Sequence, residues 1–149
     1  MNPATVHDGI VKVLNTRLGR RTDLTVTAFP GARPSTSAAS IEVWPDPGNF
    51  VEYWKSFGTD GQLELGVRVR VEIPGGDADT AGRLMADLLG TGSDAPNSIV
   101  DALRSDPTLG GVVDDIIPQT AEWDVDDESF NHIAWLPCRV LIQKAGAVV

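Results

Sequence analysis

The sequence of 149 residues contains one cysteine and two histidines. A single cysteine excludes an internal disulfide and any zinc site built from paired cysteines, because both need more than one thiol. Long apolar runs are also missing: none approaches the roughly 20 residues of a membrane-spanning helix, and the N-terminus lacks the apolar stretch of a secretory signal. We therefore expect no membrane span and no dependence on disulfides.

Basic residues are scarce as well, with 12 lysines and arginines against 21 aspartates and glutamates and a net charge of −9. Nucleic acids and anionic membranes attract clustered positive charge, so this balance argues against either as a binding partner. The length suits a single domain, residues 1–149. A content of 42% hydrophobic and 22% charged residues is that of an ordinary globular protein.

Catalytic motifs are missing too. No Gly-x-Ser-x-Gly elbow presents a serine to His7 or His132, so neither histidine is expected to act in a catalytic triad. Residues 90–95 match Gly-x-Gly-x-x-Ala, but they follow a predicted helix, whereas a dinucleotide loop leaves a strand and opens a helix. We expect no catalytic residue and no cofactor.

Carboxylates gather at Asp124, Asp126, Asp127 and Glu128. Such a run could bind a hard cation through its oxygens, but the glycine and the distant glutamate of an EF-hand loop are missing. The pattern favours a solvated acidic loop over residues 124–131, and no metal site is expected.

The first residues have the apolar period of a helix that buries one face. Asn2 is placed to cap this helix, Pro3 suits its first turn, and Gly19 is expected to end it in the left-handed conformation. The apolar stripe consists of Val6, Ile10, Val13, Leu14 and Leu18.

Two more helices are predicted further along the chain. Asp77 or Asp79 caps the first of them, which ends at Gly90. Asn97 or Ser98 begins the other, which is short. Each carries apolar residues at helical spacing.

Strands are predicted wherever apolar and polar residues alternate. The clearest case is residues 62–73, where alternation holds for six cycles and predicts a strand of about 40 Å. Other patterns predict strands over residues 24–28, 41–44, 112–123 and 133–143.

Prolines interrupt two of these strands. Pro118 indicates an edge strand or a bulge, and a change of phase at Leu136-Pro137 predicts a bulge in the last strand. The order of elements predicts an α+β fold, in which a mostly antiparallel sheet of about five strands has two to three helices packed on one face.

Five of the nine aromatic residues fall within fourteen positions. They do not share one period, so they cannot all enter one face of a core. One interpretation is that this segment folds over the sheet edge, and the other is a contact with another protein, because aromatic side chains give large contact areas at little entropic cost. The five residues are Trp44, Phe50, Tyr53, Trp54 and Phe57.

Several segments in sequence order match a known pattern. They are the aromatic segment 53–57, the alternating strand 63–73, the helix with Leu84, Met85, Leu88 and Leu89, residues 98–103, and residues 106–111 with Leu109-Gly110-Gly111. Together they resemble the tail terminator, or tail completion, proteins of long-tailed phages. The resemblance covers nearly the whole chain except the acidic residues 124–128 and the proline-interrupted last strand. Nine arginines against three lysines are typical of a GC-rich genome.

The resemblance implies a virion structural protein and not an enzyme. Members of this family form a ring, typically a hexamer, on the head-proximal end of the tail tube, where they stop tube polymerisation. The ring presents a surface to the head–tail connector. The implied partners are further copies of the chain, the tail-tube protein and the connector protein. The implied location is the virion tail, and the host cytoplasm during assembly.

Two site hypotheses follow from this implied function. The aromatic residues Trp44, Phe50, Tyr53, Trp54 and Phe57 are expected at the interface with neighbouring subunits or the tube. The acidic residues Asp124, Asp126, Asp127 and Glu128 are expected in the lumen or on the face toward the connector. Six copies at −9 each would carry −54, so DNA should pass the lumen without specific binding.

Two other classes of function remain open. A connector adaptor or a tail-tube subunit has a similar size, and a tube subunit would polymerise on its own. A small acidic enzyme or binding domain would need a concave pocket with convergent polar groups, which the sequence does not indicate.

Overall fold

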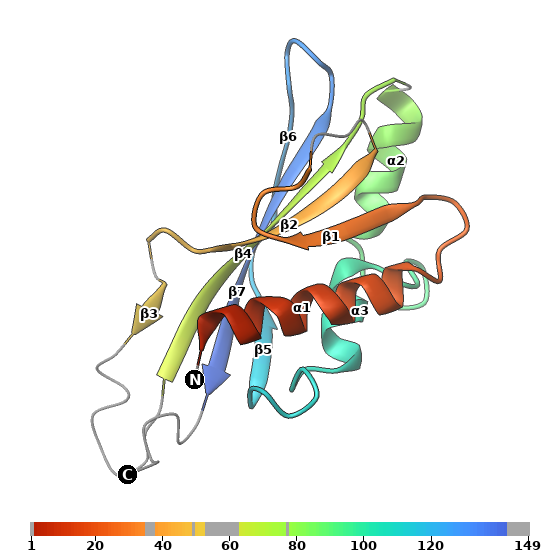
Figure 1. Ribbon diagram of the computed structural model, residues 1–149. Coiled ribbons are helices and arrows are strands. Elements are labelled where there is room, and N and C mark those ends of the chain that lie inside the picture. The colour runs from red at the N-terminus through yellow and green to blue at the C-terminus, as the bar shows by residue number, and fades with distance from the viewer. Residues whose placement is uncertain (1, 35–37, 49, 53–62, 77, 143–149) are drawn as a thin grey trace, which may run out of the picture.

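A computed structural model of the chain describes residues 2–34, 38–48, 50–52, 63–76 and 78–142. It contains three helices and one mixed, mostly antiparallel sheet, which confirms the predicted α+β class. The strand order is β1-β2-β4-β7-β5, while β3 pairs with β4 and β6 pairs with β7 (Figure 1). The strands are β1 (Val26–Pro30), β2 (Ala39–Pro45), β3 (Val51–Glu52), β4 (Leu63–Ile73), β5 (Asp115–Pro118), β6 (Glu122–Val125) and β7 (His132–Ile142).

Helix α1 (Pro3–Leu18) begins where the sequence predicts, because the Asn2 side chain accepts a hydrogen bond from the Ala4 N–H at 3.0 Å. The predicted left-handed stop at Gly19 is wrong, since this residue is right-handed with a φ of −62°. The last turn is instead closed by N–H groups of Arg20 and Arg21, which bond to carbonyls three residues earlier.

Helices α2 (Ala78–Leu88) and α3 (Ile99–Ser105) complete the helical layer. Ser98 caps α3, and its side chain accepts a hydrogen bond from the Asp101 N–H at 3.2 Å. The three helices and the sheet share one apolar core, to which every helix contributes fully buried side chains. Examples are Ile10, Leu14, Met85, Leu88, Ile99 and Leu103.

Strands β4 and β7 form the centre of the sheet. They are antiparallel over their whole length, from the pair Leu63 and Ile142 to the pair Ile73 and His132. The odd-numbered side chains of β4 from Leu65 on and the even-numbered side chains of β7 are buried and face the helices. The opposite face of β4 is polar and charged, with Glu64, Arg68, Arg70 and Glu72, and we call it the open face.

The predicted bulge at Leu136-Pro137 is wrong, because burial alternates without a break along β7. The Pro137 carbonyl accepts a hydrogen bond from the Gln119 N–H at 2.8 Å, so this residue faces the outer side of β7. A strand residue directs its N–H and C=O to the same neighbour. The missing N–H of Pro137 therefore falls where β5 has ended, and the ladder with β4 stays intact.

The predicted strand over residues 112–123 is two shorter strands. β5 and β6 both pair with the outer edge of β7, and residues 119–121 separate them. Pro118 ends β5 at the sheet edge, as its missing N–H favours. The predicted acidic loop 124–131 is likewise corrected, since Asp124 and Val125 belong to β6. β6 and β7 form a hairpin that projects from the sheet (Figure 1).

Candidate interaction surfaces

Charged side chains form a network on the open face of the sheet. Glu72 accepts hydrogen bonds from Arg70 at 2.7 Å, from Arg33 at 2.5 Å and from Asn131 at 3.3 Å. Arg70 also pairs with Glu42 at 3.2 Å. The network joins β2 and β4 to the segment just before β7, so it fixes the base of the hairpin to the sheet.

The surroundings of Glu72 alter its acidity. Burial of the carboxylate opposes ionisation, but hydrogen bonds and charge from Arg70 and Arg33 outweigh it and hold the pKa of Glu72 below its ordinary value of 4.5. A lowered carboxylate pKa stabilises the fold above pH 4.5, and this stabilisation is lost as the pH falls through the folded-state value.

We predict that Glu72→Gln lowers the free energy of unfolding by about 1–2 kcal/mol near pH 7, because bonds to charged partners are lost. The difference from wild type should shrink as the pH is lowered below 4.5. Urea unfolding at several pH values measures both effects. Glu122→Gln, at an exposed position of β6, is the control; an equal, pH-independent loss in both variants would contradict the prediction.

Trp44 lies on the open face, next to a shallow hollow of about 320 Å³ that Arg68, Arg70 and Trp135 also line. The Arg68 guanidinium carbon lies 4.0 Å from the centre of the Trp135 ring, and that of Arg70 lies at 5.3 Å. These distances are typical of cation–π contacts. The Nε atom of Arg68 is buried and has no hydrogen-bond partner among the described residues.

Only part of the predicted aromatic cluster can be located. Trp44 is half-buried in β2, and Phe50 is 36% exposed just before β3, where its carbonyl accepts a hydrogen bond from the Gly66 N–H. Tyr53, Trp54 and Phe57 lie outside the described residues. The expected interface of these five aromatic residues stays a prediction.

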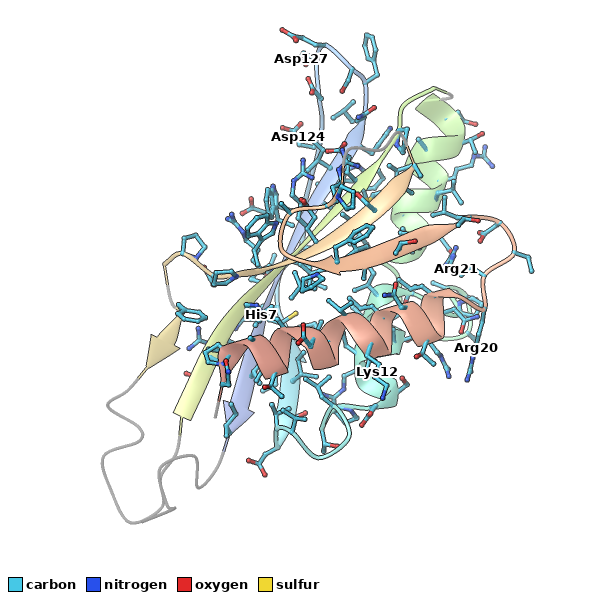
Figure 2. All side chains as sticks on the ribbon, viewed as in Figure 1. His7, Lys12, Arg20, Arg21, Asp124 and Asp127 are labelled. Atoms are coloured by element: carbon cyan, nitrogen blue, oxygen red, sulfur yellow. The ribbon has the colours of Figure 1, made fainter. Side chains whose placement is uncertain are left out.

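The predicted acidic residues lie together on the hairpin, and all four are exposed (Figure 2). Asp124 is in β6, whereas Asp126, Asp127 and Glu128 form the turn. The Asp126 carboxylate accepts a hydrogen bond from the Glu128 N–H at 3.0 Å, and this bond, with a further one from Ser129, lowers the pKa of Asp126. Asp126 therefore shapes the turn, while Asp127 and Glu128 project from it.

Apolar side chains on the same hairpin are a feature that the sequence analysis missed. Trp123 is 45% exposed and Phe130 is 58% exposed. Val125, which lies between them in the sequence, is 39% exposed. The Trp123 Nε1–H donates to His132 Nδ1 at 3.0 Å, which fixes the indole at the base of the hairpin. The apolar residues on both sides of the acidic run were the available signal in the sequence.

Phe130 also has an unusual backbone, with a φ of 59°. Bulky side chains rarely adopt this left-handed conformation, which glycine and asparagine tolerate. Because the Phe130 ring is mostly exposed, its burial contributes little stability to offset the cost of this backbone conformation. The fold of one chain therefore does not explain why a phenylalanine occupies this position. Strain at an exposed aromatic residue points to a role in contacts with another molecule.

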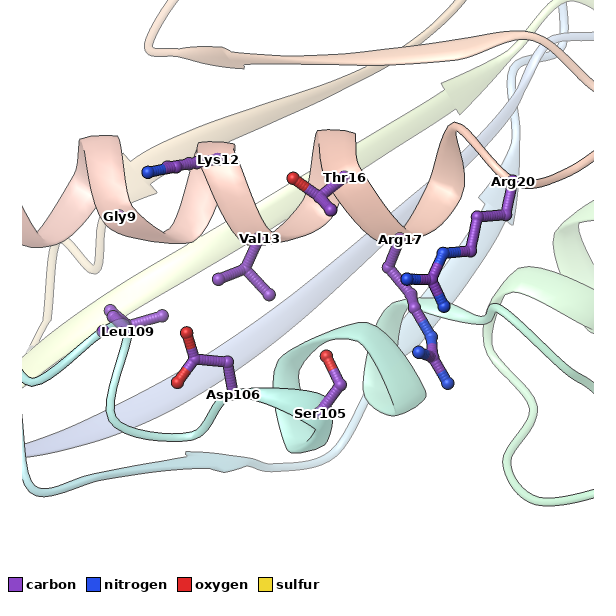
Figure 3. A pocket seen from close by; sticks show the side chains of 10 residues that line it. Gly9, Lys12, Val13, Thr16, Arg17, Arg20, Ser105, Asp106 and Leu109 are labelled. Carbon is purple, nitrogen blue, oxygen red and sulfur yellow. The ribbon is translucent and has the colours of Figure 1, made fainter.

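A second hollow of about 300 Å³ lies between α1 and the C-terminal end of α3 (Figure 3). Its apolar wall includes Val13 and Leu109, and Arg17 and Arg20 point from α1 toward α3. Lys12, Thr16, Ser105 and Asp106 also line it. The sequence does not indicate this hollow, because α1 and α3 are far apart in the chain and meet only in the folded core.

Burial affects the acidity of two further titratable side chains, His7 and Cys138. His7 is half-buried, and burial lowers its pKa. Burial raises the pKa of Cys138 to about 12, which keeps the thiol protonated. Within the ranges that the structure describes, no three acidic, histidine or cysteine side chains lie close enough to hold a metal ion.

Among the described residues, every helix is too short or too polar to span a bilayer.

Comparison with known proteins identifies no family. A scan against protein-family models finds no match, and a search of curated proteins finds no similar sequence.

Proposed function

We propose that the chain is a tail terminator of a long-tailed phage, which forms a ring, as a hexamer, on the head-proximal end of the tail tube. In this role it stops tube polymerisation and offers the head–tail connector a docking surface. It performs no reaction, and its partners are further copies of itself, the tube protein and the connector.

The observation that carries this proposal is the projecting hairpin of β6 and β7. The hairpin exposes Trp123, Val125 and Phe130, with Phe130 in a left-handed conformation. Exposed aromatic and apolar residues with acidic neighbours are typical of protein contact surfaces. A protein that acts through contacts with copies and partners needs such a projection, whereas a monomeric enzyme does not.

The distribution of charge supports passage of DNA through a ring. By the register of β6 with β7, Glu122 and Asp124 lie on the open face, beside a hollow that Ile133 and Trp135 line. Carboxylates facing a channel repel the phosphates of duplex DNA. We place Asp124 toward the lumen or the connector for this reason.

Electron microscopy of particles assembled without this protein tests the proposed function. We expect tails of uncontrolled length, or tails of normal length that are not joined to heads, because nothing caps the tube. Normal infectious particles would overturn the proposal.

A tail-tube subunit or a connector adaptor is the second candidate function. The projecting hairpin would serve as a contact surface in these proteins as well. Purified protein that polymerises into long tubes would identify a tube subunit. Joined tails on leaking or empty heads, in particles lacking the protein, would identify an adaptor.

A further inference from the structure

The hollow between α1 and α3 is a basic site in an acidic protein. Lys12, Arg17 and Arg20 line it, and Asp106 is its one carboxylate among the described residues. The Asp106 side chain already accepts a hydrogen bond from Thr108 at 3.3 Å. Three cations next to one engaged carboxylate leave the hollow positive, although the whole chain carries −9.

Two arginines at this hollow lack the ion pairs that most other described arginines have, and Arg68, whose Nε is likewise without a partner, instead stacks on the Trp135 ring. Arg21 pairs with Asp23 and Asp87, and Arg104 pairs with Asp115. Arg17 and Arg20 have no ion pair within the described ranges, and the Arg17 Nε atom is buried without a hydrogen-bond partner. A buried donor without an acceptor costs stability, so this guanidinium fits an acceptor from outside the chain.

The acidic hairpin offers the matching chemistry. Asp127 and Glu128 are exposed at its turn, and Phe130 follows them with 58% of its side chain exposed. The hollow has a complementary composition, since its cations line it together with the apolar side chains of Val13 and Leu109. Paired charges around a buried aromatic side chain are the usual composition of a specific protein contact.

The two surfaces lie on different parts of the molecule. Figure 2 shows Asp127 at the far end of the hairpin, whereas Lys12 lies on α1 and Arg20 follows the end of that helix. One copy therefore cannot satisfy its own hollow. If the hairpin of each copy binds the hollow of the next, the contact is head-to-tail, and such contacts close into rings when the rotation permits.

We propose that the hairpin turn of one copy docks in the α1–α3 hollow of a second copy, with Phe130 against the apolar wall and Asp127 and Glu128 facing Arg17 and Arg20. The contact would supply the subunit interface of the proposed ring. It rests on the proposed function only in assuming that successive contacts close into a ring. It assigns Asp127 and Glu128 to the subunit interface and leaves Asp124 for the lumen.

Engineered cysteines test which surfaces meet. Cys138 is buried, so a thiol placed at an exposed position reacts selectively. We expect Thr16→Cys and Asp127→Cys, when mixed and oxidised, to form a disulfide-linked heterodimer. The double variant in one chain should give a ladder of covalent oligomers. Predominant Asp127→Cys homodimers, a disulfide within one chain, or no covalent dimer at the highest soluble concentration would each overturn the contact.

Charge reversal tests what holds the surfaces together. We expect Lys12→Glu/Arg20→Glu and, separately, Asp127→Lys/Glu128→Lys to weaken self-association at least tenfold by sedimentation. All four residues are exposed, so the fold should persist by circular dichroism. The quadruple variant keeps the net charge of −9 and should restore association. Unchanged association in either double variant, or no recovery of association in the quadruple variant, would overturn the assignment.

Two further variants test whether the effect of charge is specific to the hollow and whether Phe130 takes part in the contact. Arg83→Glu, on the exposed face of α2, should leave association unchanged. Phe130→Asn should abolish association without loss of stability, because asparagine suits the left-handed backbone; association unchanged in this variant would contradict docking of Phe130. Normal infectious particles assembled without the protein would overturn the proposed function. If the cross-linked ladder still formed in that case, the contact between copies would stand without the function.

Discussion

Replacing Gly75 by alanine is expected to lower the free energy of unfolding by about 3 kcal/mol, at the upper end of the usual cost of overpacking. A Cβ atom on Gly75 would lie 2.0 Å from the Phe130 carbonyl oxygen and 2.4 Å from its carbon. Both contacts are with backbone, so no side-chain rotation relieves them. Either the loop after β4 or the hairpin has to move.

The neighbouring glycine provides a matched control for this prediction. A Cβ atom on Gly76 would meet no heavy atom within 4 Å, so Gly76→Ala should stay within about 0.5 kcal/mol of wild type. Urea unfolding of both variants measures the difference. Equal stability of the two variants would mean that the loop and Phe130 do not approach each other as described.

Arg21→Ala is expected to cost about 2–3 kcal/mol, because it removes a buried group with several partners. The Arg21 side chain is 3% exposed. Its guanidinium binds the carboxylates of Asp23 and Asp87 and donates to the Asn97 carbonyl at 3.1 Å. One side chain thus links the end of α1 to α2 and to the turn before α3. Asp87 would be left without its cation.

Thermal unfolding measures this loss, and we expect the melting temperature to fall by about 5–10 °C for a domain of this size. Arg20→Ala is the control, since the adjacent residue is exposed and its removal should change the melting temperature by about 1 °C or less. Similar losses in both variants would show that Arg21 acts only through the general charge at the helix end.

The elements predicted correctly from the sequence depend on local patterns. The alternation of β4 and the apolar stripe of α1 are both found, with Asn2 as the cap of α1 and Ser98 as the cap of α3. Such features can be predicted because a few neighbouring residues determine which face of an element is buried and which residue caps a helix.

The wrong predictions concern segments whose structure depends on pairing with distant parts of the chain. Residues 112–123 are predicted to be one strand, but pairing along β7 divides them after Pro118 into β5 and β6. The absence of a bulge at Pro137 follows from the same break, since its missing N–H meets no partner strand there. Neither outcome is encoded in the local sequence.

The candidate surfaces were predicted in part. The expected exposure of Asp124, Asp126, Asp127 and Glu128 is found, although Asp124 is in a strand, and their place in the lumen or toward the connector stays a prediction. The exposure of Phe130 and Trp123 was missed, although their places on both sides of the acidic run were a signal in the sequence, because large apolar residues are usually highly buried. The α1–α3 hollow needs two helices that only the folded core brings together.

The central position of β4 and β7 has a consequence for how the chain matures. β4 ends at Ile73 and β7 begins at His132, so during synthesis on the ribosome β4 leaves the exit tunnel long before its main partner. Pairings between such distant segments form slowly, and the bare edge of β4 attracts other nascent strands meanwhile. Since β7 also carries one side of the hairpin, the hairpin and the centre of the sheet both wait for the same late segment of the chain. For the proposed ring contact, a chain whose β7 has not yet been synthesised would therefore have no hairpin with which to dock.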